Sequence, residues 1–202
     1  MAKWTQEERD SFFRATIHWG VAAFVIGFYG FYGLSVMEVR ALGRGFVIVV
    51  ITIELWKFIH APFRAWVIRH YGELMRPHEK NGITGFGELA VGIYLAVEFF
   101  PKSVALLAII SVAADPVARI VGLHWGHVRL RNGKTLSGAF ACLVASNVLT
   151  LALAFLLSGQ DVSFTAAMLI RAPFYIAALE LASRRHDNLI VPVGTAALLT
   201  IF

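Results

Sequence analysis

Residues 103–123 read SVALLAIISVAADPVARIVGL, an apolar run in which Asp115 directly precedes Pro116. A helix that crosses a bilayer needs roughly 17–25 mainly apolar residues, so this stretch is long enough to span one. Other stretches of the chain have the same character, although the last of them is short. We therefore expect seven membrane-spanning helices, at about residues 13–36, 45–63, 83–100, 103–123, 135–157, 162–182 and 187–202.

The composition of the 202-residue chain agrees with this interpretation. Apolar residues make up 58% and charged residues 15%, with a mean hydropathy of +0.69, whereas a soluble domain carries about 25% charged residues. The single cysteine excludes an internal disulfide, and the hydrophobicity excludes a disordered chain. The net charge of +5 indicates anionic partners, but nucleic acid is a poor candidate for a chain buried in lipid. We predict an all-α integral membrane protein, with one helical bundle over residues 1–202.

The positions of lysine and arginine predict how the bundle is oriented. With seven spans, the N-terminus and the second, fourth and sixth loops share one side, which should be cytoplasmic, and Phe202 should lie outside. The opposite side carries only Arg40, Arg44 and Lys102. The basic residues on the cytoplasmic side are Lys3, Arg9, Arg14, Arg64, Arg69, Arg76, Lys80, Arg119, Arg129, Arg131, Lys134, Arg184 and Arg185.

Ionisable residues within the spans also gather toward the cytoplasmic half. They include His18, Glu88, Asp115, Glu180 and Asp187. Each such group is costly in a bilayer and needs a partner or a function. A transporter would carry polar groups through the midplane, so this distribution predicts a site that faces the cytoplasm and one leaflet.

Three helix starts should lie at the cytoplasmic face, after Thr84, Thr135 and at Asp187. Their free backbone N–H groups suit phosphate, although each residue is also an ordinary N-cap. Thr135 is the strongest candidate because Gly133 and Lys134 precede it. The spacing is not that of a Walker A loop, and no strand precedes it, so we reject a P-loop.

Asp115 should sit at a break in its helix, because proline disfavours helix at the preceding residue and fits the first turn of a new one. The alternative is a plain N-cap at a proline kink. Arg119 follows four residues later, with Gly122 and Gly126 beyond it. An acidic group beside basic ones at the inner face suits a metal and a phosphate together.

Glu180 and Asp187 flank a short turn, so both can face Asp115 across the bundle. Hard oxygen ligands of this kind favour Mg²⁺ carried with a nucleotide. Glu180 could instead pair with Arg184 on the same helix face.

The ordered set of motifs resembles the CTP-dependent lipid-alcohol kinases, which include dolichol kinase, phytol and farnesol kinases and the CTP-using diacylglycerol kinase. The resemblance covers nearly the whole chain and is most specific over residues 76–138. The segments that carry it are Arg14 with His18, Glu54-Leu55-Trp56, Arg76 to Gly85, Ala114-Asp115-Pro116, Gly122 with Gly126, Gly133 to Gly138, and Asp187-Asn188.

This resemblance implies transfer of the CTP γ-phosphoryl group to a lipid hydroxyl, with CDP as the second product. It implies catalytic roles for Asp115, Lys134, Asp187, Glu180 and His18, and Mg²⁺ held by the three acids. The implied nucleotide-binding residues are Arg76, Glu79, Arg119, Gly122, Gly126, Arg131, Gly133, Lys134, Thr135, Ser137, Gly138 and Asn188.

Two alternatives stay open at this point. A CTP:phosphatidate cytidylyltransferase-like enzyme would also need CTP, Mg²⁺ and a lipid, but it would release pyrophosphate. A small transporter or scaffold would have no catalytic site. The lipid alcohol, the choice between base and metal ligand among the acids, and the oligomeric state (a homodimer being one option) also stay open.

Overall fold

The computed structural model describes residues 5–32, 34–130 and 132–202, and these form eight α-helices, a π-helical turn and no strand. The helices are α1 (Gln6–Ile26), α2 (Val36–Ile59), α3 (Ala61–Tyr71), α4 (Gly85–Phe99), α5 (Lys102–Trp125), α6 (Leu136–Leu156), α7 (Ala166–Ala182) and α8 (Asp187–Ile201), with the π-helical turn η1 (Gly27–Phe31) after α1. The predicted all-α class is confirmed, and each expected span corresponds to a helix.

Three of these helices are long and apolar enough to cross a membrane, namely Glu8–Phe31, Lys102–Trp125 and Leu136–Leu156. Asp187–Ile201 is a shorter apolar helix. The structure thus gives a helical protein with several membrane-spanning candidates, while seven spans and their orientation stay predictions.

Two helices begin earlier than the apolar runs indicated, because capping boxes set their first residues. Thr5 and Glu8 cap α1 reciprocally, and Ser35 and Glu38 do the same for α2. Such caps satisfy N–H groups that have no partner within the helix. Most of α3 falls in the connection between the second and third expected spans, and its first turn has Pro62 and the cap of His60.

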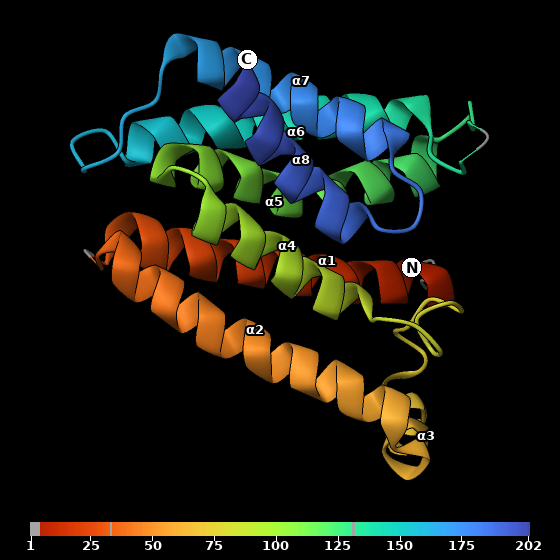
Figure 1. Ribbon diagram of the computed structural model, residues 1–202. Coiled ribbons are helices and arrows are strands. Elements are labelled where there is room, and N and C mark those ends of the chain that lie inside the picture. The colour runs from red at the N-terminus through yellow and green to blue at the C-terminus, as the bar shows by residue number, and fades with distance from the viewer. Residues whose placement is uncertain (1–4, 33, 131) are drawn as a thin grey trace.

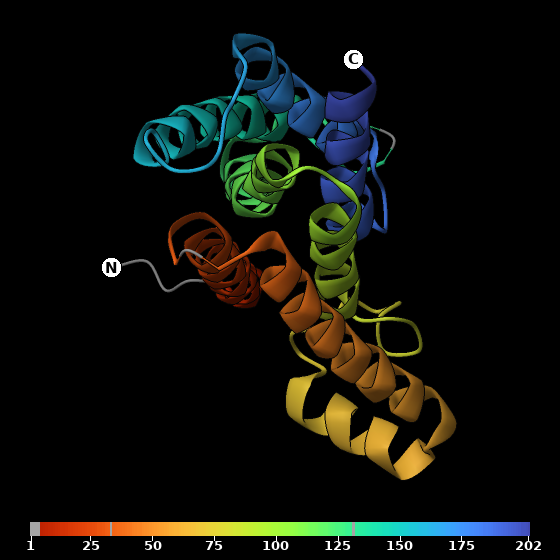
Figure 2. The ribbon, with the colours of Figure 1, turned by 60° about the vertical axis from the view of Figure 1, so that its left-hand side comes forward.

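Helix α5 is the centre of the fold. It packs against α1, α4, α6, α7 and α8, and Figure 2 shows it nearly end-on with other helices around it. Its residues from Val104 to Ile110 are all buried. The apolar run 103–123 therefore forms the core against which the other helices pack.

The predicted break at Asp115 does not occur, since α5 is continuous through Pro116. Proline removes one helical hydrogen bond and crowds the preceding turn. The carbonyl that loses its helical donor is that of Val112. One residue further on, the Trp19 indole N–H of α1 donates to the Ala113 carbonyl oxygen at 3.0 Å and joins α1 to this part of α5. Five other helices pack against α5 and keep it helical on both sides of the proline. Asp115 therefore lies within a helix that extends beyond it in both directions.

The starts of α4, α6 and α8 lie at one end of the bundle, on the right in Figure 1. The segments 72–84, 126–130, 132–135 and 183–186 lie at the same end, and the short connections before α5 and α7 lie at the other. This agrees with the expectation that Thr84, Thr135 and Asp187 share a face. The polar site is built at this end.

Candidate functional site

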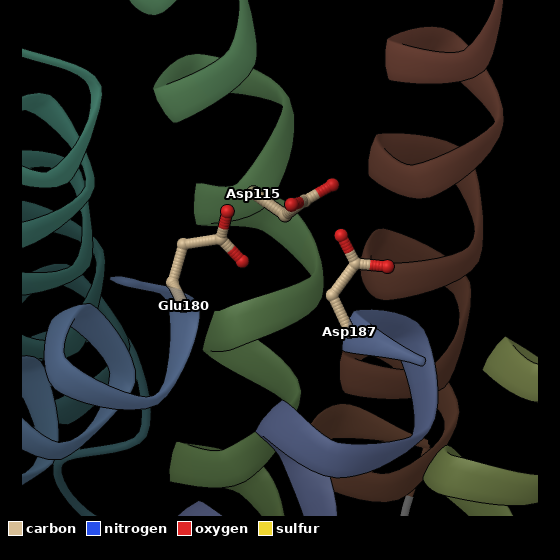
Figure 3. A group of neighbouring side chains, drawn as sticks. All are labelled: Asp115, Glu180 and Asp187. Atoms are coloured by element: carbon tan, nitrogen blue, oxygen red, sulfur yellow. The ribbon is translucent and has the colours of Figure 1, made fainter. Parts of the chain in front are cut away.

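Three helices bring three carboxylates together, as Figure 3 shows: Asp115 from α5, Glu180 from α7 and Asp187 from the first turn of α8. One oxygen of each lies within 4.8 Å of those of the other two. Glu180 and Asp187 are buried, with 4% and 5% of their surfaces exposed, and Asp115 is partly open. The predicted clustering of these acids is confirmed.

Two basic side chains offset this negative charge. The Lys134 ammonium contacts Glu180 and lies 3.2 Å from Asp187 Oδ2. Arg76 donates to Asp187 Oδ1 at 3.2 Å and lies 3.6 Å from Glu79. Among the described residues, no lysine or arginine forms an ion pair with Asp115, and the His18 Nε2 lies 3.9 Å from its Oδ2.

The charges of the two cations are fixed by these acids. Burial alone would lower the pKa of Lys134, but the attraction of Glu180, Asp187 and Asp115 outweighs it and raises that pKa above its ordinary value. Burial opposes the charge of Arg76 in the same way, and its attraction to Asp187 raises the pKa above the ordinary value. Both side chains therefore stay charged at neutral pH.

A cavity of about 510 Å³ opens beside the acids. Its lining is strongly basic and includes the first turn of α6 at Thr135 and Gly138. A volume of this size falls in the range of small-molecule sites, and basic side chains with a helix N-terminus suit a polyphosphate. The basic residues that line it are Arg76, Arg119, Arg129, Lys134 and Arg184, with His78 beside them.

The turn before α6 positions Lys134 over the acids. The Leu130 N–H donates to the Lys134 carbonyl at 2.8 Å, and Gly133 takes the positive φ of 84° that this tight turn requires. The Asn132 side chain accepts from the Lys134 N–H at 3.2 Å and donates to the Leu181 carbonyl at 2.6 Å. Asn132 thus joins this turn to the end of α7, next to Glu180.

Asn132, Arg129 and Arg184 line the cavity but were not among the residues assigned to the site from the sequence. The available signal was weak: an Asn before a glycine is typical of a turn, and nothing in the sequence placed Leu181 beside it. Arg131, which was assigned to the nucleotide, lies outside the described residues.

His18 and Asn188 lie on the other side of Asp115. The His18 Nε2 lies 3.1 Å from Asn188 Oδ1, which accepts from it, and the His18 Nδ1 lies 2.9 Å from the Arg14 carbonyl oxygen. The Asn188 amide donates to the Gly85 carbonyl at 2.9 Å. These bonds tie α1, α4 and α8 together directly beside the acids.

The glycines near Thr135 act through close packing. A Cβ on Gly122 would lie 2.8 Å from the Thr135 hydroxyl oxygen, and one on Gly138 would lie 2.7 Å from the Ala118 carbonyl oxygen. The buried Thr135 hydroxyl accepts from the Gly138 N–H at 3.1 Å and so caps α6. Gly126 likewise faces the Thr135 methyl group.

Of the remaining assigned residues, Arg119 and Gly133 line the cavity, and Arg119 also donates to the Ser11 hydroxyl at 3.1 Å. The others lie around the site without lining the cavity. Glu79 pairs with Arg76, and the Ser137 hydroxyl lies 3.5 Å from that of Thr135. Glu79, Ser137, Gly126 and Asn188 are therefore placed where they can hold the residues that face the cavity.

The acid cluster fits a divalent cation. Glu180 Oε2 is buried and makes no hydrogen bond within the described part of the chain, and such an orphaned oxygen is costly unless something binds it. Three carboxylates with oxygens this close repel one another, and a hard cation with oxygen ligands would relieve that repulsion.

Comparison with known proteins gives two informative relatives. Over 166 residues the chain is 30% identical to "Uncharacterized protein RP860" of Rickettsia prowazekii, with 78% of this chain and 79% of that protein covered. Over 213 positions it is 24% identical to "CTP-dependent diacylglycerol kinase 1" of Schizosaccharomyces pombe, with 97% and 95% covered. No family model and no solved structure matches.

The Schizosaccharomyces pombe relative agrees with the resemblance to CTP-dependent lipid kinases at the level of that family. The Rickettsia prowazekii relative is more similar in sequence and is covered over most of its length. The chain belongs to the same protein family as this Rickettsia prowazekii protein.

Proposed function

We propose that this protein is a membrane kinase that transfers the γ-phosphoryl group of CTP to the hydroxyl of a lipid alcohol at the cytoplasmic face. The observation that carries the proposal is the buried acid cluster of Asp115, Glu180 and Asp187 at the edge of a basic cavity. The relative that is a CTP-dependent diacylglycerol kinase supports the nucleotide and the lipid character of the substrate.

The cavity would hold the triphosphate. Lys134, Arg119 and Arg129 line it and can donate charge-assisted hydrogen bonds to phosphate oxygens. Phosphoryl transfer depends mainly on such positioning and on stabilisation of negative charge. Lys134 also contacts Glu180 and Asp187, so the same side chain can link the nucleotide to the acids.

Asp115 is the best placed of the three acids to accept a proton. Glu180 and Asp187 are paired with Lys134 and Arg76, whereas Asp115 is partly open and faces His18. The lipid hydroxyl oxygen would attack the γ-phosphorus, the bond from that phosphorus to the β–γ bridging oxygen would break, and CDP would leave. The hydroxyl proton would go to the Asp115 carboxylate, with His18 orienting it.

Mg²⁺ would be held by Asp115, Glu180 and Asp187, which fit it by donor type and by the orphaned Glu180 oxygen. When bound, such an ion neutralises phosphate charge and orients the transferred group.

The lipid would reach the acids from the apolar side of the bundle. A second, small hollow borders the same three carboxylates, and four of its other lining residues are apolar, while His18, Ser111 and Asn188 are polar. Its apolar lining residues are Leu89, Val112, Val191 and Pro192. The acids thus lie between a basic cavity that suits phosphates and the apolar interior.

The test is to follow where the phosphorus of CTP goes. Purified protein in lipid vesicles would receive Mg²⁺, a panel of lipid alcohols and phosphatidate, with CTP labelled in either the α- or the γ-phosphate. We expect the lipid to gain the γ-label and not the α-label, with CDP released. An α-labelled lipid with free pyrophosphate would instead establish cytidylyl transfer, and no labelled lipid from any acceptor would refute the kinase assignment.

A further inference from the structure

The short helix α3 and the end of α2 carry an exposed run of aromatic rings. Trp56 stacks on Phe63 with ring centres 4.3 Å apart, and Phe63 stacks on Trp66 at 6.0 Å. Trp66 also lies 6.1 Å from Tyr71. Trp56, Trp66 and Tyr71 are each about half exposed, and such a surface in water would be unfavourable.

Helix α3 contacts little of the protein. Its packing partner among the described helices is α2, and none of its residues is fully buried. Figures 1 and 2 show it beyond the main bundle, and in Figure 1 it is seen almost end-on while α1, α5 and α6 run across the picture. It therefore lies across the direction of the helices that would span a membrane.

The charge of α3 has one sign. Residues 61–71 include Arg64, Arg69 and His70 and no acidic residue. Tryptophan and tyrosine favour the boundary between hydrocarbon and headgroups, and arginine favours anionic headgroups. Aromatic and basic side chains on a short helix that lies across the spans fit the surface of an anionic leaflet.

The length of α2 supports the same position. Its 24 residues correspond to about 36 Å at 1.5 Å per residue, which exceeds a hydrocarbon core of about 30 Å, although α2 is not one of the three helices that are also apolar enough to cross a membrane. Ile48, Val49 and Leu55 of α2 are exposed, and this apolar surface continues into the aromatic run. At the other end of the bundle, Tyr32 and Phe99 are also exposed, so aromatic residues mark both boundaries.

The position of α3 also bears on the site through the segment that follows it. The Arg14 Nε of α1 donates to the Leu74 carbonyl at 2.9 Å, and the buried Lys57 of α2 donates to the Gly82 carbonyl at 2.7 Å. Between these two anchors lies Arg76, which pairs with Asp187. A helix fixed at the membrane surface would hold the first end of this segment in place.

We infer that α3 lies in the headgroup layer of an anionic leaflet, with the rings of Trp56, Phe63, Trp66 and Tyr71 at the hydrocarbon boundary and Arg64 and Arg69 among lipid phosphates. Helix α3 is thus a surface anchor, separate from the phosphoryl-transfer chemistry. The proposal concerns the bilayer as partner, and a second copy of the chain is the competing occupant that the experiment distinguishes.

The experiment measures the depth of a nitroxide label in the full chain, reconstituted in phosphatidylcholine vesicles with and without phosphatidylglycerol. Cys142→Ala removes the native thiol, and a cysteine at exposed Ala65 carries the label without disturbing the aromatic run. Labels at Val49, mid-way along α2, and at Gln160, in the connection before α7, give the lipid and water references. Accessibility to oxygen and to a water-soluble nickel chelate reports depth.

We expect the label at Ala65 to fall between the two references, and to become less accessible to the nickel chelate when phosphatidylglycerol is added. The double variant Arg64→Gln/Arg69→Gln should lose this response to anionic lipid while the reference positions stay unchanged. A label at Ala65 that matches Gln160 in both lipids would overturn the proposal. So would a label that is shielded from both reagents, which would indicate contact with a second copy.

Discussion

The Asn132 amide donates to the Leu181 carbonyl oxygen at 2.6 Å, which joins the turn before α6 to the last turn of α7. Glu180 precedes Leu181, and Lys134, whose N–H binds Asn132 Oδ1, contacts Glu180. One side chain therefore sets the position of the main cation of the site relative to its acid. This relationship leads to a test that does not touch the charged groups.

Replacing Asn132 by alanine should weaken the use of CTP with little effect on folding. A lost hydrogen bond contributes roughly 0.5–1.5 kcal/mol, so the turn should loosen and the KM for CTP should rise several-fold. Steady-state kinetics with varied CTP would measure this, with Asn147→Ala on the exposed face of α6 as the matched control. A KM equal to that of the control would show that the tie to Leu181 does not position Lys134.

Replacing Lys134 itself should reduce the use of CTP more than replacing Asn132. Lys134→Met removes a cation that faces both the cavity and two acids, and loss of a charged hydrogen bond costs about 1.5–3 kcal/mol, or roughly tenfold to a hundredfold in kcat/KM for CTP. Lys134→Arg keeps the charge and should retain more activity. Thermal unfolding in detergent would separate this effect from misfolding, and unchanged CTP kinetics in a folded Lys134→Met variant would remove Lys134 from the nucleotide site.

The buried ion pair of Lys57 and Glu54 in α2 leads to a prediction about stability. Lys57 is 2% exposed and lies 2.7 Å from Glu54 Oε2, and Glu54 Oε1 accepts from the Thr84 N–H at 3.2 Å at the start of α4. Removal of one partner from a buried pair costs about 3–5 kcal/mol because it leaves the other charge uncompensated.

We therefore expect Lys57→Met to unfold much more readily than the native chain, and Glu54→Gln/Lys57→Met to recover part of the loss. Unfolding in mixed detergent micelles would compare the three proteins. Equal stability of the single and double variants would show that the pair does not hold the start of α4.

The sequence predicted most of the fold because the apolar runs are long and the breaks between them contain turn residues. It also predicted that Asp115, Glu180 and Asp187 can face one another, since each is a costly acid in the half of its span that was expected to lie toward the cytoplasm. Two features were not predicted correctly. Helix α3 was missed because it is short and contains both basic and apolar residues, so its sequence resembles that of a basic loop. The break at Asp115 was predicted from the local preference of proline, but α5 is continuous there.

In α5 the local preference of Pro116 is overridden by tertiary packing. The Trp19 indole of α1 donates to the Ala113 carbonyl, three residues before the proline, and α1, α6 and α8 pack against the helix. The partners of Asn132 and His18 are likewise 49 and 170 residues away in the chain. Contacts at such separations are set by how helices pack, and no local pattern in a single sequence encodes them.

The orientation of the bundle can be tested at its last helix. Helix α8 begins at the end of the bundle that carries the basic segments, so a protein with seven spans would have Phe202 on the opposite side. We expect a phosphatase reporter fused after Phe202 to be active outside the cytoplasm, and a fluorescent reporter that folds only in the cytoplasm to stay dark. The reverse pattern would require an even number of spans.

Asp115 offers the sharpest test of the proposed reaction. Because α5 is continuous through Asp115, the carboxylate is not needed to cap a helix, and Asp115→Asn should leave the fold intact. Asparagine keeps the size and the hydrogen-bonding oxygen but loses the charge and the ability to take a proton. If Asp115 accepts the hydroxyl proton or binds Mg²⁺, kcat should fall by about two orders of magnitude or more.

Two further measurements distinguish these roles of Asp115. A loss of basicity alone would leave the binding of CTP with Mg²⁺ nearly unchanged, whereas a lost metal ligand would shift the Mg²⁺ dependence to higher concentrations. The matched control is Asp161→Asn in the exposed connection before α7, which should behave like the native protein. If Asp115→Asn keeps substantial turnover, proton transfer must occur elsewhere. Glu180 would then be the next candidate, because its Oε2 is buried beside the same cavity without a hydrogen-bond partner among the described residues.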